Sequence, residues 1–87
     1  MVKEATERVQ QMEQYFEMLQ KVANTNPDRF FWDDSVKEIL HTLKEYYEGG
    51  QWMMDYELDE KGFFPKEMKR GVLSQDSLYN LLEEIKK

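Results

Sequence analysis

The sequence contains no cysteine, one histidine, two prolines and four glycines among its 87 residues. Without cysteine, the chain can form neither a disulfide nor a thiolate that acts as nucleophile or metal ligand. Its uninterrupted apolar runs are no longer than triplets such as residues 52–54, whereas a membrane-spanning helix needs about 20 apolar residues. The opening MVKEATERVQ contains no apolar run, so we expect no signal peptide. These absences predict a cytoplasmic protein without a membrane segment.

Acidic residues outnumber basic ones, and they are concentrated in one part of the chain. The net charge is −6 at pH 7, residues 45–60 hold six acids and no base, and residues 61–70 hold four bases and one acid. Phosphate groups and anionic lipids repel a negatively charged protein. We therefore expect neither direct binding of nucleic acid nor binding to a membrane.

Apolar residues recur at alternating steps of three and four near the N-terminus, which predicts an amphipathic helix over residues 2–23. This seam consists of Val2, Ala5, Val9, Met12, Phe16, Leu19 and Ala23. Arg8 and Glu13 fall outside the seam, on the face expected to meet water. The helix should end before NTNPD, because Pro27 disfavours helical geometry at Asn26. The same seam could pair between two chains, so a homodimer through this helix is one predicted assembly.

A second helix is predicted to follow DRFFWDDSV, where Asp33, Asp34 or Ser35 can accept hydrogen bonds from the first free amides. Gly49 and Gly50 should end it, since glycine is common just beyond the last turn of a helix. The connection between the two predicted helices is short. They should therefore form an antiparallel hairpin.

The remainder of the chain contains weaker patterns and one clear helix. Residues 51–64 alternate like a strand, but no second strand is predicted that could pair with their backbone, so a short helix is favoured. PKEMKRG predicts one helical turn from Pro65 to Gly71, and Ser74 precedes a final amphipathic helix. The predicted fold is all-α: a single domain, 1–87, with an antiparallel hairpin of two long helices, one or two short helices and a C-terminal amphipathic helix.

The run YYEGGQWMMDYELDEKGFFPKEMKRGVLSQDSLYNLL, residues 46–82, resembles the signature of a small bacterial family catalogued as domain of unknown function 4298. The motifs that carry the resemblance are GGQWMMDYE, DEKG, the following proline and KRGVLSQDSLYNLL, in that order. The resemblance implies a bacterial or phage origin and a small, mainly helical domain. It implies no activity, cofactor or catalytic residue.

The stretch MMDYELDEKGFF imitates part of a calcium loop, because Asp55, Glu57 and Asp59 match its first, third and fifth positions. Glu60 stands where the loop requires glycine, and Lys66 stands where a bidentate glutamate belongs. The stretch is therefore better interpreted as a solvated acidic surface. Its members are Asp55, Glu57, Asp59 and Glu60. We predict neither a metal site nor a cofactor.

The sequence also offers little for catalysis, and we do not expect an enzyme. His41 is the single histidine, and it lies in the predicted second helix without a cysteine to activate. Ser35 and Ser74 are explained by helix starts. So small a domain also seldom provides the concave site that catalysis needs.

Two functions of other classes remain, and the first is a protein-interaction domain with an unknown protein partner. The segments between the predicted helices carry many large apolar residues. They are Phe30, Phe31, Trp32, Trp52, Met53, Phe63 and Phe64. The candidate partner surface consists of Trp32, Trp52, Met53, Phe63 and Phe64. An alternative interpretation is that these side chains cap the ends of one core, because a small domain needs the buried area.

The second function is that of an acidic decoy, which would occupy the basic groove of a nucleic-acid-binding protein. The acidic surface supports it, whereas lysines that interrupt the acidic faces of both long helices weaken it.

Overall fold

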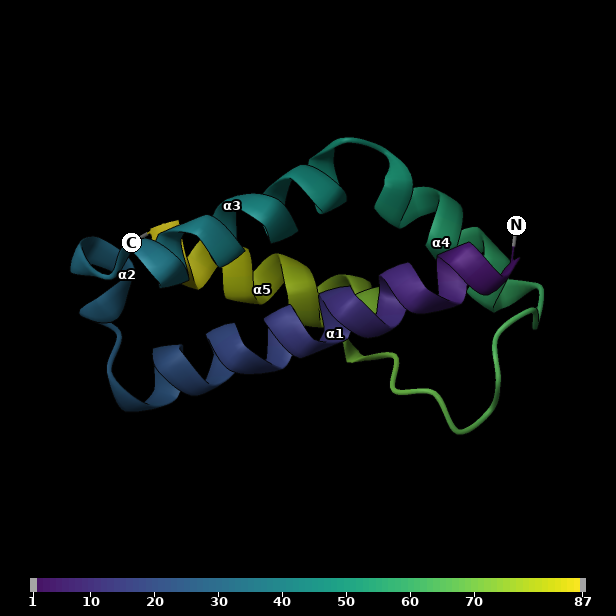
Figure 1. The fold of residues 1–87 in the computed structure, drawn as a ribbon, viewed down its shortest axis with the longest axis horizontal. Helices are drawn as coiled ribbons and strands as arrows, with labels where there is room; N and C mark the ends of the chain where they lie inside the picture. Colours follow the sequence, from purple (N-terminus) through teal and green to yellow (C-terminus); the bar gives the residue numbers. More distant parts are fainter. Residues whose placement is uncertain (1, 87) are drawn as a thin grey trace.

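The computed structural model describes residues 2–86, which form helices and connections with no strand in that range (Figure 1). The helices are α1 (Val2–Thr25), α2 (Arg29–Trp32), α3 (Asp34–Glu48), α4 (Gln51–Glu60), the 3-10 turn η1 (Gly71–Leu73) and α5 (Gln75–Lys86). The predicted all-α class is confirmed, and so is the short helix favoured for the stretch after Gly50.

Helices α1 and α3 run antiparallel and contact each other, and α5 lies along the space between them (Figure 1). Helix α4 continues from α3 after a bend and lies beside the N-terminal part of α1. The molecule measures 38 × 24 × 21 Å along its principal axes. Helix α2 lies at one end of the long axis and α4 lies at the other, so the two short helices are far apart (Figure 1).

The predicted seam of α1 forms the centre of the core. Ala5, Val9, Phe16 and Leu19 are buried, and Met12 and Ala23 pack against the core from its edge. The side chain of Val2 lies outside the described part. The other helices contribute Val36, Leu43, Tyr46, Trp52, Leu78, Leu81 and Leu82 to the same core. Because the seam is buried within one chain, a homodimer through α1 would have to use a different face of this helix.

The ends of α1 and α3 follow from local chemistry. Helix α1 ends at Thr25, close to the predicted position. Of the three cap candidates for α3, the structure uses Asp33, whose Oδ1 accepts hydrogen bonds from the amides of Ser35 (3.0 Å) and Val36 (3.4 Å). The turn between the helices contains α2, which is not predicted from the sequence. Nη2 of Arg29 in α2 lies 2.9 Å from Oδ2 of Asp33.

We call residues 61–74, which connect α4 to α5, the strap. The helical turn predicted from Pro65 to Gly71 is wrong, because the strap makes a tight turn at Pro65–Met68 and its 3-10 turn starts later, at Gly71. The amide of Met68 donates to the carbonyl of Pro65 at 3.2 Å, and Nη2 of Arg70 donates to the carbonyls of Phe64 (3.3 Å) and Pro65 (2.6 Å), so this segment is held as a single turn.

Candidate functional site

One member of the predicted acidic surface, Asp55, lies in the core, where its side chain is fully buried at 0% exposure. Arg8 holds it with two contacts, Nε to Oδ2 at 2.9 Å and Nη2 to Oδ1 at 2.5 Å. The hydroxyl of Tyr46 donates to Oδ2 at 2.7 Å. The assignment of Asp55 to a solvated surface is therefore wrong, since both of its oxygens join α4 to α1 and α3.

A second member of that surface, Asp59, is half-buried and lies 2.7 Å from Nε of Arg70 in the strap. This ion pair joins the acidic stretch of residues 45–60 to the basic stretch of residues 61–70. Glu57 and Glu60 remain exposed, as predicted. Residues 55–60 are helical, so Asp55 and Asp59 share one side of α4, and Glu57 and Glu60 share another. Within residues 2–86, no group of three or more acids or histidines could hold a metal ion.

The predicted partner surface also divides into buried and exposed members. Trp52 is 3% exposed and Phe64 is 4% exposed, so placing these two on a partner surface is wrong. The indole of Trp52 stacks on Tyr56 and donates from Nε1 to the carbonyl of Val72 at 2.8 Å. For these residues the alternative interpretation, core side chains that hold the connections to the bundle, describes the structure.

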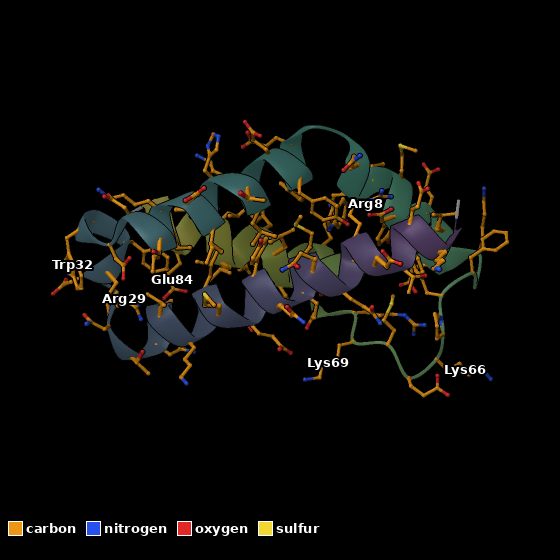
Figure 2. The ribbon with its side chains drawn as sticks, in the orientation of Figure 1. Arg8, Arg29, Trp32, Lys66, Lys69 and Glu84 are labelled. Atoms are coloured by element: carbon orange, nitrogen blue, oxygen red, sulfur yellow. The ribbon has the colours of Figure 1, made fainter. Side chains whose placement is uncertain are left out.

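The exposed members lie at opposite ends of the molecule. Trp32 is 63% exposed at the α2 end, where its side chain points away from the bundle (Figure 2). Met53 and Phe63 are exposed at the α4 end. Two further exposed side chains join them: Phe31 (69%) beside Trp32, and Met54 (62%) beside Met53. The sequence therefore predicted one surface where the structure has two.

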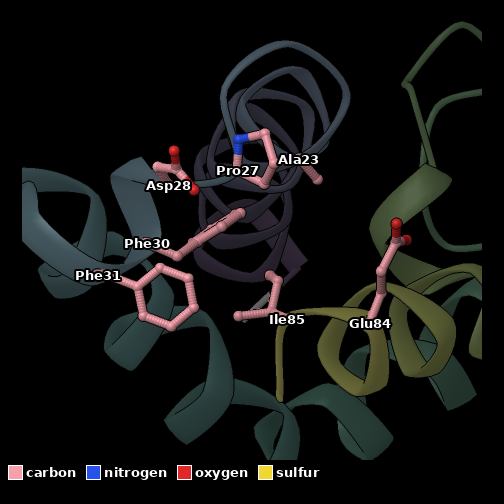
Figure 3. Close-up of a pocket in the computed structure, with 7 residues that line it drawn as sticks. All are labelled: Ala23, Pro27, Asp28, Phe30, Phe31, Glu84 and Ile85. Carbon is pink, nitrogen blue, oxygen red and sulfur yellow. The ribbon is translucent and has the colours of Figure 1, made fainter. Parts of the chain in front are cut away.

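A hollow of about 250 Å³ lies beside α2, and we call it the α2 hollow (Figure 3). It is lined by Ala23, Pro27, Asp28, Phe30, Phe31, Glu84 and Ile85. A second hollow of about 190 Å³ adjoins it and shares Phe30, Phe31 and Ile85 with it. Figure 3 shows the two phenylalanines on the α2 side and Ile85 on the α5 side. Phe31 is thus an exposed aromatic ring with a concave apolar surface beside it.

Glu13 is a further buried carboxylate, and the sequence analysis had placed it on the face that meets water. It is 7% exposed, and its Oε1 accepts the amide hydrogen of Val72 in the strap at 2.7 Å. Burial raises the pKa of Glu13, and the hydrogen bond from Val72 opposes part of that rise. A raised pKa suits an acid–base catalyst, but this carboxylate already accepts a hydrogen bond from the backbone of the strap. Its position beside the seam is the one signal that could have indicated burial.

The reactive side chains considered for catalysis lie at the surface or at helix starts. His41 is exposed on α3. Its Nε2 lies 3.0 Å from Oε1 of Glu45, which is one turn further along the helix. Ser35 lies in the first turn of α3, and Ser74 directly precedes α5. These residues come from different elements and are explained by the helices that contain them.

The fold and these surfaces define a small all-α domain whose buried polar side chains hold its own helices and strap together. Exposed aromatic and methionine side chains lie at both ends of the bundle, and Met18 of α1 and Tyr79 of α5 are exposed as well. The chain belongs to the family described as Domain of unknown function (DUF4298), whose model matches residues 2–87. The predicted family is thereby confirmed, and the match extends from the motifs of residues 46–82 to essentially the whole chain. Comparison with curated proteins gives no match, and comparison with solved structures gives none.

Among the helices of residues 2–86, none combines the length and the apolar character that crossing a membrane requires.

Proposed function

We propose that this protein is a small cytoplasmic protein-interaction domain that binds a partner protein through its α2 end. The observation that supports the proposal is the exposure of two adjacent aromatic rings, Phe31 at 69% and Trp32 at 63%, beside the α2 hollow. Burying such rings against a partner removes roughly 150–250 Å² each from water. Aromatic anchors that enter pockets supply much of the binding energy at protein interfaces.

The size of the α2 hollow favours a protein partner over a small molecule. Its volume of about 250 Å³ lies below the roughly 300–1,000 Å³ of pockets that enclose drug-sized ligands. A single apolar side chain of a partner suits such a space. The rings also stand on a turn that is held in place, because Arg29 pairs with the cap residue Asp33. A rigid binding surface loses little entropy when the partner docks.

The experiment compares capture from a bacterial lysate by the unaltered protein and by the double variant Phe31→Ser, Trp32→Ser, at low and at high salt. We expect a specific protein to be captured at both salt concentrations and to be lost with the double variant, since an apolar contact is little affected by ionic screening. The matched control is Met18→Ser, which changes an exposed apolar side chain elsewhere and should leave capture unchanged. Equal capture by the double variant would contradict the proposal.

The acidic decoy is the second candidate function, and the exposed carboxylates of Glu57 and Glu60 support it. Asp55 and Asp59 are paired within the chain, which leaves the decoy less acidic surface than the sequence indicates. A decoy should lose its basic partner steeply as salt rises and should retain it in the Phe31→Ser, Trp32→Ser variant. The same experiment therefore separates the two functions.

A further inference from the structure

Helix α4 has apolar side chains that pack into the bundle and others that are exposed. Trp52 on the inner face is buried, and Leu58 packs against the core. On the outer face Met53 is 50% exposed and Met54 is 62% exposed. Phe63, which lies in the strap shortly after the end of α4, is exposed as well. An outward apolar face is not needed to fold α4, because the inner face already contributes to the core.

Carboxylates accompany these apolar groups. Glu57 follows Met53 by one turn, and Glu60 follows Glu57 by three residues, so these three lie on one side of α4. We call Met53, Met54, Glu57 and Glu60 the α4 face. Both glutamates are exposed.

Three basic residues in this part of the molecule are engaged elsewhere, so they do not neutralise the two glutamates of the α4 face. The guanidinium of Arg8 holds the buried Asp55, and that of Arg70 lies against Asp59. Lys69 pairs with Glu17 of α1, and Lys66 extends from the tip of the strap (Figure 2). Lys61 is the basic residue that directly follows α4.

We propose that the α4 face binds a basic amphipathic helix of a partner protein. Methionine side chains are flexible and adapt to the apolar stripe of such a helix. Lysines or arginines that flank the stripe would meet Glu57 and Glu60. Charge also argues against other occupants, because a second copy of this chain carries a net charge of −6 and an anionic lipid surface is negative as well. The site lies at the opposite end from α2 and does not depend on the function proposed for that end.

The test uses a synthetic peptide of leucine and lysine, with the leucines at helical spacing, and a counterpart with glutamate in place of every lysine. Binding to the whole protein is measured by titration calorimetry. We expect the lysine peptide to bind, more weakly as salt rises, and the glutamate peptide to give no binding. The double variant Met53→Ala, Met54→Ala should weaken binding of the lysine peptide by about tenfold or more, because both apolar anchors are truncated.

Two controls locate the contact. Met18→Ala truncates an equally exposed methionine on α1, and the Phe31→Ser, Trp32→Ser variant alters the α2 end; both should bind the lysine peptide as the unaltered protein does. Equal binding by the Met53→Ala, Met54→Ala variant would show that the peptide is attracted by net charge alone and would overturn the proposal. Absence of binding to the unaltered protein would overturn it too. Because the α2 variant is a control here, failure of this proposal leaves the function proposed for the α2 end untouched.

Discussion

At the scale of single residues, the structure depends on the carboxylate of Asp55, which is completely buried. Removing a charge from water costs several kcal/mol, and a buried ion pair recovers this cost only with good geometry and further hydrogen bonds. Asp55 has both, from the two contacts of Arg8 and the hydroxyl of Tyr46. Burial, together with the hydrogen bond to Asp55, raises the pKa of Tyr46 far above its ordinary value, so this hydroxyl remains a donor at any pH the protein meets.

Replacing Asp55 by alanine should therefore be strongly destabilising. The change leaves the guanidinium of Arg8 and the hydroxyl of Tyr46 without their partner, and removing one member of a buried pair costs about 3–5 kcal/mol. Urea unfolding measures the loss. The matched control is Glu57→Ala, an exposed carboxylate two residues away, which should change stability by less than about 0.5 kcal/mol.

A small domain has about 5–15 kcal/mol of stability in total, so the loss expected for Asp55→Ala is a large part of it and a milder variant is needed as well. Asp55→Asn provides a second comparison, because its amide oxygen can still accept from Tyr46 while the charge that Arg8 meets is lost. We expect its unfolding free energy to lie between that of the unaltered protein and that of the alanine variant. A result in which the Asp55 variants are as stable as Glu57→Ala would contradict the role assigned to this carboxylate.

At the scale of elements, the strap is the segment whose position needs explanation, because most of it has no helical ladder. Its backbone is held at Val72, where the amide donates to Glu13 of α1 and the carbonyl accepts from Trp52 of α4. Gly71 permits the approach: a Cβ there would lie 3.0 Å from Oε2 of Glu13 and 3.1 Å from the ring of Phe16. The strap thus connects α1 to α4 through its own backbone polar groups.

The raised pKa of Glu13 makes the stability of this connection depend on pH. In the folded protein Glu13 keeps its proton to a higher pH than in the unfolded chain, where its ordinary pKa is 4.5. The folded state then binds more protons than the unfolded state, so the contribution of this group to stability is full below pH 4.5 and declines as the pH rises through the folded pKa. Glu17 and Lys69 face the same carboxylate, the first raising its pKa and the second lowering it.

Glu13→Gln should remove that decline, because an amide does not titrate over this range and its oxygen can still accept from Val72. We expect the free energy of unfolding of the variant to fall less above pH 4.5 than that of the unaltered protein. Urea denaturation from pH 4 to pH 8, roughly the range in which carboxyl groups and histidine titrate, measures both. Glu7→Gln, an exposed glutamate of α1, should retain the decline. A decline in Glu13→Gln as steep as in the Glu7→Gln control, or steeper, would refute the assignment.

At the scale of the whole molecule, α4 and the strap share one core with the hairpin. Trp52, Phe64 and Val72 belong to the same buried cluster as the seam of α1 and the apolar side of α5. Elements that bury one another's side chains should unfold together, as most small single domains do. The two tryptophans differ in this respect, since Trp52 lies inside the cluster and Trp32 lies on the surface.

Trp32→Phe leaves Trp52 as the single tryptophan and tests this cooperativity directly. In urea, the fluorescence of Trp52 and the far-ultraviolet circular dichroism of all helices should give one common midpoint. The circular dichroism midpoint of the unaltered protein should be nearly the same, because Trp32 is 63% exposed. If fluorescence changes at a lower urea concentration than circular dichroism, α4 and the strap unfold independently of the hairpin.

Much of the fold could be predicted from the sequence, and the candidate surfaces could be predicted in part. Trp32, Met53 and Phe63 were identified as exposed candidates from their position between helices, and they are exposed. Trp52 and Phe64 have the same apolar character and the same kind of position, yet they are buried. Composition cannot separate these two groups, because the difference depends on which connection folds back over the bundle.

The spacing of apolar residues by itself determined the long helices and the all-α class, because a helical period depends on neighbours three and four positions apart. The short connection between the two long helices determined their antiparallel arrangement. The tertiary structure alone decided which charged side chains would be buried. Arg8 meets Asp55 across 47 positions, and Glu13 meets Val72 across 59. Both acids had appeared to face water, since a carboxylate in a sequence carries no sign of a partner that distant. The cost of burying its charge is offset only after the chain has brought that partner within hydrogen-bonding distance.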